Sequence, residues 1–238
     1  MFSKYNFTAM PVVDGEERLV GIVTVDDAIE VITEEATEDI EIMAGMLPSE
    51  KPYLKTGVFQ IWLNRIPWLL LMMVSATFTG MIINGYESSL AAHVALTSFI
   101  PMLMGTGGNS GSQSSVTAIR SLSLGEIEFS DIIRVLWKEI RVSVLCGVTL
   151  GVVGFGKIML IDGLLLGNSD ITLTIALVVS LTLVMVVFVA KVIGCVLPLV
   201  ADKIGFDPAV MANPFITTIV DALALLVYFV IASAILPM

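Results

Sequence analysis

The chain has 238 residues, of which 56% are hydrophobic and 14% are charged, and its mean hydropathy is +0.94. This composition excludes an ordinary soluble domain and is typical of a polytopic membrane protein embedded in a lipid bilayer. A formal net charge of −10 argues against nucleic acid as a partner and fits divalent cations as ligands.

The amino-terminal segment predicts a β-hairpin that leads into a helix. Residues 9–13 and 19–25 are short apolar runs rich in β-branched side chains, and a turn of sequence Asp-Gly-Glu-Glu separates them. From Asp26 the spacing of apolar residues becomes helical, and Thr24 is the expected N-cap. Two strands and one helix are too few to bury a core of their own, so we expect further residues of the same domain upstream.

This segment resembles the second half of a cystathionine-β-synthase-type (CBS) regulatory module. The resemblance rests on Met-Pro-Val-Val-Asp at 10–14, Leu-Val-Gly-Ile-Val-Thr at 19–24, and Asp27. It implies that residues 1–32 are the end of a CBS domain. In such modules the Gly-x-x-Thr-x-x-Asp stretch can bind an adenosine nucleotide. We predict no nucleotide site here, because the other half of the pocket is absent from the sequence.

The helix expected from Asp26 onward is amphipathic and strongly acidic. Apolar side chains at positions 29, 32, 36, 40 and 43 fall on one side, and acids fall on another. Residues 26–41 hold eight acids and no base, so like charges four residues apart repel one another unless cations screen them. We assign residues 33–57 to this acidic helix and to the proline-containing linker that follows it.

Residues 58–238 predict an all-α membrane domain with five transmembrane helices. The expected spans are 66–83, 90–104, 142–161, 171–192 and 213–236. The loops on the amino-terminal side of the membrane carry five bases, Arg120, Arg134, Lys138, Arg141 and Lys203. By the positive-inside rule the amino terminus is therefore cytoplasmic, in a plasma membrane, and the carboxyl terminus is outside. We interpret Lys157 and Lys191, near the ends of spans, as snorkelling anchors.

The second predicted span ends in a stretch rich in glycine and serine, Gly-Thr-Gly-Gly-Asn-Ser-Gly-Ser-Gln-Ser-Ser at 105–115. We expect the helix to give way here to non-helical backbone. At membrane depth such backbone is tolerated only inside protein or along water. The alternative interpretation is a seam of small residues that allows helices to pack closely.

The last apolar stretch, residues 213–236, contains one acid, Asp221. An ionised carboxylate within a span costs roughly 2.5 to 3.5 kcal/mol on the insertion scale, so we expect Asp221 to face protein, water or a cation. Asn213 and Thr217 precede it at intervals of four residues and therefore share its helix face. A stripe of oxygen ligands that leads to one carboxylate indicates a cation pathway.

Several motifs resemble the MgtE family of magnesium transporters. They are Pro101 with the stretch at 105–115, Ile-Arg-Ser-Leu-Ser-Leu-Gly-Glu at 119–126, Asp-Pro-Ala at 207–209, and Asn-Pro-Phe at 213–215 followed by Thr-Ile-Val-Asp at 218–221. The CBS-like tail and Glu-Glu-Ala-Thr-Glu-Asp at 34–39 match as well. Together these motifs cover essentially the whole chain. Family members normally have a complete amino-terminal domain and two CBS modules, of which this sequence retains the end of the second.

The resemblance implies a homodimer that imports Mg²⁺ through a pore near the twofold axis, lined by the second and fifth spans of both subunits. Mg²⁺ sheds water reluctantly and prefers an octahedron of oxygens, so carboxylates and carbonyls can hold the hydrated ion. Mn²⁺ and Ca²⁺ are the expected competing ions. The implied pore residues are Asp221 as the selectivity carboxylate, then Asn213, Thr217 and the backbone at Pro214, and on the opposing wall Gly107, Gly108 and Asn109.

The acidic helix resembles the family's connecting or plug helix, which closes the cytoplasmic mouth when Mg²⁺ bridges its acids to neighbouring carboxylates. Mg²⁺ is thereby both the transported and the regulatory ion. The implied sensor ligands are Glu34, Glu35, Glu38 and Asp39, with Asp207 as their membrane-side partner. Independently of the resemblance, two acid clusters pressed together repel until a divalent ion neutralises them.

Other classes of function remain to be weighed. An ion-coupled carrier with Asp221 as a relay needs the same carboxylate as a channel does, so the sequence does not separate the two. An intramembrane serine protease would use Gly-x-Ser-Gly at 108–111, but the only histidine, His93, lies upstream of the serine and not downstream. The scattered methionines and the two distant cysteines indicate neither a copper pathway nor a zinc site. We therefore expect no enzyme.

Overall fold

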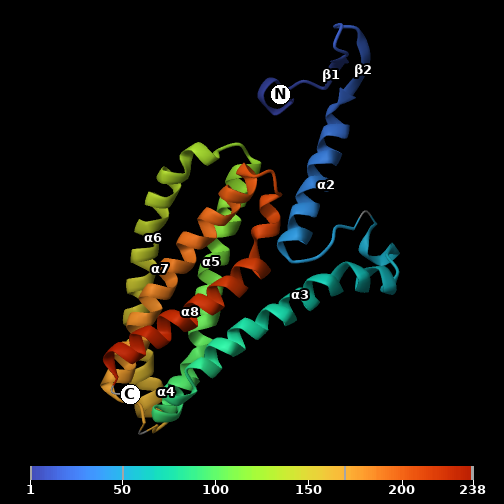
Figure 1. Ribbon diagram of the computed structural model, residues 1–238. Helices are drawn as coiled ribbons and strands as arrows, with labels where there is room; N and C mark the ends of the chain where they lie inside the picture. Colours follow the sequence, from blue (N-terminus) through green and yellow to red (C-terminus); the bar gives the residue numbers. More distant parts are fainter. Residues whose placement is uncertain (1, 50, 169, 237–238) are drawn as a thin grey trace.

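A computed structural model describes residues 2–49, 51–168 and 170–236, without the side chains of Ser3, Lys4 and Asn213. An amino-terminal arm projects from one end of a helical bundle (Figure 1). The arm begins with the short helix α1 (Phe2–Tyr5), followed by strands β1 (Ala9–Val13) and β2 (Leu19–Thr24). These strands pair antiparallel, with a bulge between Val12 and Val13. The predicted hairpin is therefore confirmed.

Helix α2 (Val25–Met43) continues the arm from the hairpin to the bundle. Thr24 is its N-cap, as predicted, and its backbone N–H donates to the Asp27 carboxylate at 3.0 Å. Apolar side chains of the hairpin and of α2, such as Val20, Ile22 and Ile32, are exposed. The described side chains of the arm therefore form no core of their own, as expected for too few elements.

The described residues of the bundle form five long helices. They are α3 (Val58–Gly85), α5 (Ile100–Ser123), α6 (Ile132–Lys157), α7 (Leu173–Lys203) and α8 (Asn213–Ile235). The short helix α4 (Glu87–Ala92) follows α3, and a π-helical segment (Ile158–Leu165) extends α6. Helix α7 packs against α5, α6 and α8, whereas α3 crosses α8 at the edge of the bundle (Figure 1).

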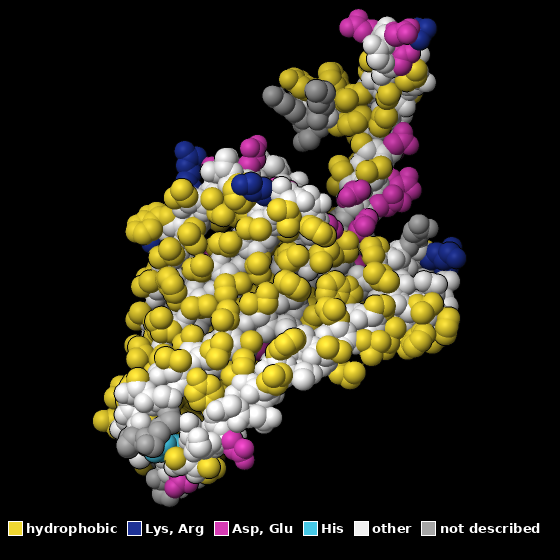
Figure 2. Space-filling view, viewed as in Figure 1, with side chains coloured by type: hydrophobic (Ala, Val, Ile, Leu, Met, Phe, Trp, Pro, Cys, Tyr) yellow, Lys and Arg dark blue, Asp and Glu magenta, His cyan; other side chains and the backbone are white. Residues whose placement is uncertain are grey.

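Four helical segments of the described residues are long and apolar enough to cross a membrane: Val58–Gly85, Phe129–Leu165, Leu173–Lys203 and Pro208–Ile235. Apolar side chains cover the visible flank of the bundle, and Lys and Arg lie towards the end from which α2 projects (Figure 2). The expected all-α polytopic membrane class is confirmed. Helix α5 falls short of the hydropathy of a span, because glycine and polar residues occupy its middle.

The predicted end of the second span is wrong. Helix α5 runs without a break through residues 105–115, and the predicted span 90–104 falls instead on α4, the 3₁₀ turn Val94–Phe99 and the start of α5. The physical reason is close packing. A Cβ atom added to Gly107 would lie 2.6 Å from Cγ1 of Val186 on α7, so only glycine lets these helices approach so closely. Burial between helices outweighs the cost of about 1 kcal/mol for a helical glycine.

The core lies in the half of the bundle that contains the carboxyl terminus. Tyr228 and Phe229 of α8 are its largest buried side chains, and the Phe229 ring stacks on Tyr86 with centroids 4.4 Å apart. The Tyr228 hydroxyl donates to the Leu96 carbonyl at 3.0 Å, so the buried phenol has the acceptor that it needs. These contacts hold the second half of α8 in place and thereby set the position of Asp221.

Candidate functional site

Asp221 lies in the interior of α8 and is half-buried. A Cβ atom added to Gly108 of α5 would lie 3.9 Å from Oδ1 of Asp221 and 3.1 Å from Cγ2 of Thr217. Gly108, Thr217 and Asp221 therefore meet at the contact between α5 and α8, and Thr217 shares the helix face of Asp221, as the spacing of four residues predicted. Within the described part of the chain, no hydrogen-bond donor and no charged side chain acts on this carboxylate.

The first turn of α8 contributes further oxygens. The Thr217 hydroxyl donates to the Pro214 carbonyl at 3.0 Å, and the Thr218 hydroxyl donates to the same carbonyl at 3.1 Å. The Pro214 carbonyl thus accepts two hydroxyls, which hold its direction. The side chain of Asn213, the remaining predicted pore residue of this helix, lies outside the described residues.

The two other predicted wall residues lie on different faces of α5. Gly107 is buried and packs against Val186 of α7 and Val220 of α8, so it belongs to the helix contact. Asn109 is exposed on the surface of this single chain, as is Gln113 one turn later. Polar side chains at membrane depth require cover by protein or water. This face of α5 is therefore suited to a second protein surface or to an aqueous pathway.

The carboxyl-terminal half of α2 brings an acid to the membrane domain. Asp39 is half-buried close to Asp207, which precedes the 3₁₀ turn Pro208–Met211 and accepts a hydrogen bond from the Ala209 N–H at 2.8 Å. Burial raises the pKa of Asp39, and the negative charges of Asp207 and Glu35 raise it further. Arg120 and the Ser123 hydroxyl, both on α5, oppose this rise in pKa. The structure therefore brings the predicted pair Asp39 and Asp207 together.

Of the other predicted sensor acids, Glu35 acts on Asp39, but Glu34 and Glu38 do not join this pair. They line a separate groove beside α2, together with Glu41 and the linker residues Pro48 and Lys51. Among the described residues, no three His, Cys, Asp or Glu side chains converge on a position that could hold a metal ion. The acids of α2 thus divide between two faces, one towards Asp207 and one towards the linker.

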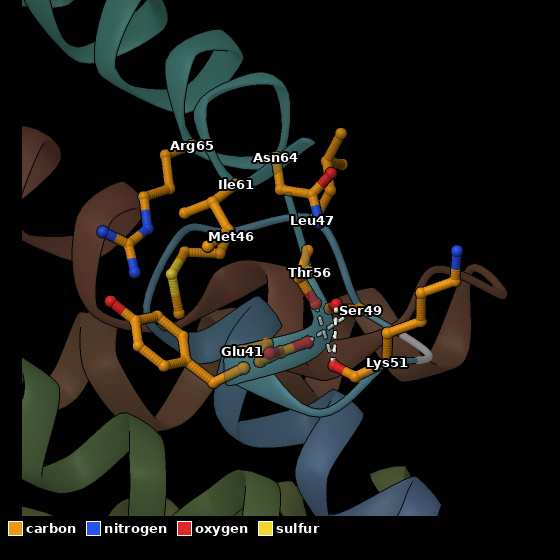
Figure 3. Close-up of a pocket in the computed structure, with 10 residues that line it drawn as sticks. Glu41, Met46, Leu47, Ser49, Lys51, Thr56, Ile61, Asn64 and Arg65 are labelled. Atoms are coloured by element: carbon orange, nitrogen blue, oxygen red, sulfur yellow. Dashed lines mark hydrogen bonds between the residues drawn. The ribbon is translucent and has the colours of Figure 1, made fainter. Parts of the chain in front are cut away.

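The end of α2 is fastened to α3 and α8, which the sequence analysis did not foresee. The Glu41 carboxylate accepts from the Ser49 N–H at 2.7 Å, and the Leu47 N–H donates to the Asn64 carbonyl of α3 at 2.9 Å (Figure 3). Gly45 ends the helix at a φ of +73°, and a Cβ atom there would lie 2.8 Å from Cγ of Pro214. The acidic helix therefore rests directly on the first turn of α8.

The interpretation of Lys191 as a snorkelling anchor is wrong. Helix α7 extends to Lys203, so Lys191 lies in the helix interior and is only 5% exposed. Its ammonium lies 3.6 Å from Oε1 of Glu139 and 3.4 Å from Oγ of Ser114. Glu139 was expected in a loop but belongs to α6, which begins at Ile132. No local signal reveals this pair, because its members lie on different helices.

Comparison with known proteins agrees with the motifs. The model of the MgtE family, described as divalent cation transporter, matches residues 100–231, and the CBS domain model matches residues 1–34. Proteins named magnesium transporter MgtE from Thermus thermophilus, Bacillus subtilis and Enterococcus faecalis are 40%, 36% and 35% identical over 99%, 98% and 96% of this chain. The chain spans about half the length of these curated relatives: 50%, 50% and 48%. On the family match and on these identities, the chain belongs to the MgtE family of divalent cation transporters.

Proposed function

We propose that this chain forms the membrane pathway of a Mg²⁺ channel, in which Asp221 is the selectivity carboxylate. The observation that carries the proposal is the position of Asp221, a single acid within α8 that faces the bare backbone of Gly108 and has no donor of its own among the described residues. Mg²⁺ keeps several of its waters when it binds, so the carboxylate, the Thr217 hydroxyl and nearby carbonyls hold the hydrated ion. Relatives of this chain carry the name magnesium transporter, which supports Mg²⁺ as the cargo.

The pathway is completed by a second copy of the chain. Among the described residues, one chain supplies one carboxylate in α8, Asp221, which no cation pairs, and no cluster of three metal-ligating side chains. Two copies place two Asp221 side chains about one ion, and the polar face of α5 with Asn109 then lies along the pathway instead of against lipid. In this homodimer α5 also crosses the membrane, so that each subunit has five membrane helices. The amino terminus is cytoplasmic, the carboxyl terminus is outside, and Mg²⁺ enters the cell.

The acidic helix α2 acts as the sensor for cytoplasmic Mg²⁺. Asp39 faces Asp207, and two carboxylates at short range repel until a divalent ion neutralises them. High Mg²⁺ therefore holds α2 against the mouth of the pathway, and low Mg²⁺ releases it. Of the predicted ligands, Glu35 lies on the face of Asp39, whereas Glu34 and Glu38 offer a second acidic face towards the linker.

Acidification is expected to favour the docked position of α2 when Mg²⁺ is absent. The pKa of Asp39 is raised when α2 is docked, so docking costs free energy only when Asp39 is ionised. This cost is absent below the ordinary carboxyl pKa of 3.8 and grows as the pH rises from 3.8 to the raised pKa.

Protease protection of α2, measured between these two pH values, should increase as the pH falls. In Asp39→Asn this pH response should be much smaller, and less Mg²⁺ should be needed for docking. In the control Asp26→Asn, which replaces an acid in the first turn of α2, the response should stay unchanged. The same pH response in Asp39→Asn would contradict the assignment.

The experiment that tests the function is Mg²⁺ flux into proteoliposomes under an imposed membrane potential and without a pH gradient. A channel carries Mg²⁺ down its electrochemical gradient, with a reversal potential set by that ion alone. A proton-coupled carrier that uses Asp221 as a relay would need the pH gradient and would shift its reversal potential with pH. The proposal would be overturned if Mg²⁺ flux were absent both under a membrane potential alone and under a pH gradient.

A further inference from the structure

Three polar side chains from three helices meet in the interior of the bundle. They are Ser114 of α5, Glu139 of α6 and Lys191 of α7. The Lys191 ammonium donates to the Ser114 hydroxyl at 3.4 Å, and that hydroxyl in turn donates to Oε1 of Glu139. Lys191 and Ser114 are 5% and 4% exposed, and the Glu139 side chain is 18% exposed. We call these three residues the interior network.

The interior network is a directional link between helices. A buried ammonium requires a partner, since an unpaired charge at membrane depth is strongly unfavourable. Glu139 supplies the opposite charge, and Ser114 bridges the two charged groups with one donated and one accepted hydrogen bond. Such bonds depend on distance and angle, so they restrict how α5 can rotate or slide along α6 and α7.

Close backbone contact surrounds the interior network. A Cβ atom added to Gly194 of α7 would overlap the carbonyl of Gly111, one turn before Ser114 on α5. Packing of this kind restricts the crossing through shape, because Val186 and Ile216 fill the space beside Gly107 and Gly111. The hydrogen bonds of Ser114 add a polar link at the same crossing.

The same helix carries the wall of the candidate pathway. Gly108 lies six residues before Ser114, about 9 Å along α5 at 1.5 Å per residue, and it faces Thr217 and Asp221. A rotation of α5 by one residue's turn of about 100° would remove the bare backbone of Gly108 from Asp221 and present a different side chain. The orientation of α5 therefore decides what lies opposite the carboxylate.

We propose that Ser114, Glu139 and Lys191 are positioning residues for ion passage, which fix the rotation of α5 so that Gly108 faces Asp221. This inference rests on the proposed function of Asp221. None of the three residues touches the ion. They act through α5, and the hydrogen bonds of Ser114 join α5 to the ion pair of α6 and α7.

Ser114→Ala tests the proposal, because it removes the hydroxyl that bonds to Glu139 and Lys191 and leaves the ion pair of these two residues intact. Ser180→Ala is the matched control, since Ser180 is also buried but, within the described part of the chain, donates only to the Ala176 carbonyl of its own helix, at 2.7 Å. In proteoliposomes, Ser114→Ala should lower Mg²⁺ flux about three- to thirtyfold and raise Ca²⁺ flux relative to Mg²⁺ flux, the range expected for a residue that acts through a coupled element. The melting temperature should match that of Ser180→Ala.

A second readout does not depend on transport. Amide hydrogen exchange of residues 105–115 in lipid nanodiscs should be faster in Ser114→Ala than in the wild type and unchanged in Ser180→Ala. Should Ser114→Ala fail to fold, the double variant Glu139→Gln/Lys191→Met, which removes both buried charges, takes its place with the same expectations. The inference would be overturned if these variants had the Mg²⁺ flux, the exclusion of Ca²⁺ and the amide exchange rates of the wild type. If the wild type itself carries no Mg²⁺, the proposed function fails, and the exchange rates alone decide on the interior network.

Discussion

Asp221→Ala is expected to lower Mg²⁺ flux through proteoliposomes about a hundredfold while leaving the fold intact. A hydrogen bond or ion contact to a charged group is worth about 1.5 to 3 kcal/mol, and tenfold in binding corresponds to about 1.4 kcal/mol. Loss of the carboxylate removes this interaction from each copy of the chain at once. No second acid of α8 can replace Asp221, because the helix contains no other.

The measurement needs variants that separate charge from volume. Asp221→Asn keeps the size of the side chain and should lose flux nearly as much as Asp221→Ala, whereas Asp221→Glu should retain part of it. Asp162→Asn is the matched control, since Asp162 pairs with Lys157 at 2.7 Å in the π-helical segment beyond α6. If Asp221→Asn has the same Mg²⁺ flux and the same Ca²⁺ flux as the wild type, this carboxylate lies outside the pathway.

Gly194→Ala is expected to destabilise the bundle by about 3 kcal/mol or more and to abolish transport. A Cβ atom at Gly194 overlaps the backbone carbonyl of Gly111, and a backbone atom inside a helix cannot turn away as a flexible side chain can. Overpacking usually costs about 1 to 3 kcal/mol, and contact with backbone places this substitution at the upper end. Helices α5 and α7 must then separate, which also moves Gly108 from Asp221.

Gly156→Ala provides the matched control for this effect. Gly156 lies within α6, and among the described residues no atom beyond its chain neighbours and the adjoining helix backbone lies within 4 Å of the position that its Cβ would take. Alanine is favoured over glycine in a helix by about 1 kcal/mol, so Gly156→Ala should leave the melting temperature unchanged or raise it. Thermal unfolding of both variants in the same detergent makes the comparison. Equal melting temperatures would contradict the close crossing of α5 and α7.

Local features of the sequence were sufficient to predict the hairpin, the acidic helix and the position of Asp221 within a long apolar helix. A lone acid in an apolar run, a row of acids at helical spacing and two β-branched runs about a turn are signals carried by neighbouring residues. The spacing of four residues likewise placed Thr217 on the face of Asp221. The structure agrees because each of these arrangements is fixed within one element.

The course of α5 could not be predicted in this way, because its cause lies in other helices. Glycine and serine disfavour a helix when the stretch is considered alone. They are favourable once Val186, Ile216 and Val220 occupy the space that larger side chains would need. The same reason explains the error at Lys191, whose partner Glu139 belongs to a different helix.

The sensor acids show a finer limit of sequence reasoning. Glu34 and Glu38 form one pair at a spacing of four residues, and Glu35 and Asp39 form another. One residue of offset turns the second pair by about 100° around the helix. Which pair faces the membrane domain depends on how α2 is seated, and that is set by Gly45 against Pro214.

The composition of α5 has a consequence for the synthesis of the protein. Helix α5 is less apolar than a segment that enters a bilayer by itself, and its two main packing partners, α7 and α8, follow it in the chain. The translocon therefore releases α5 before the surfaces that shield its polar residues exist. Stable insertion of α5 must wait for the carboxyl-terminal helices, so a nascent chain that ends before α8 leaves α5 without its packing partners in the membrane.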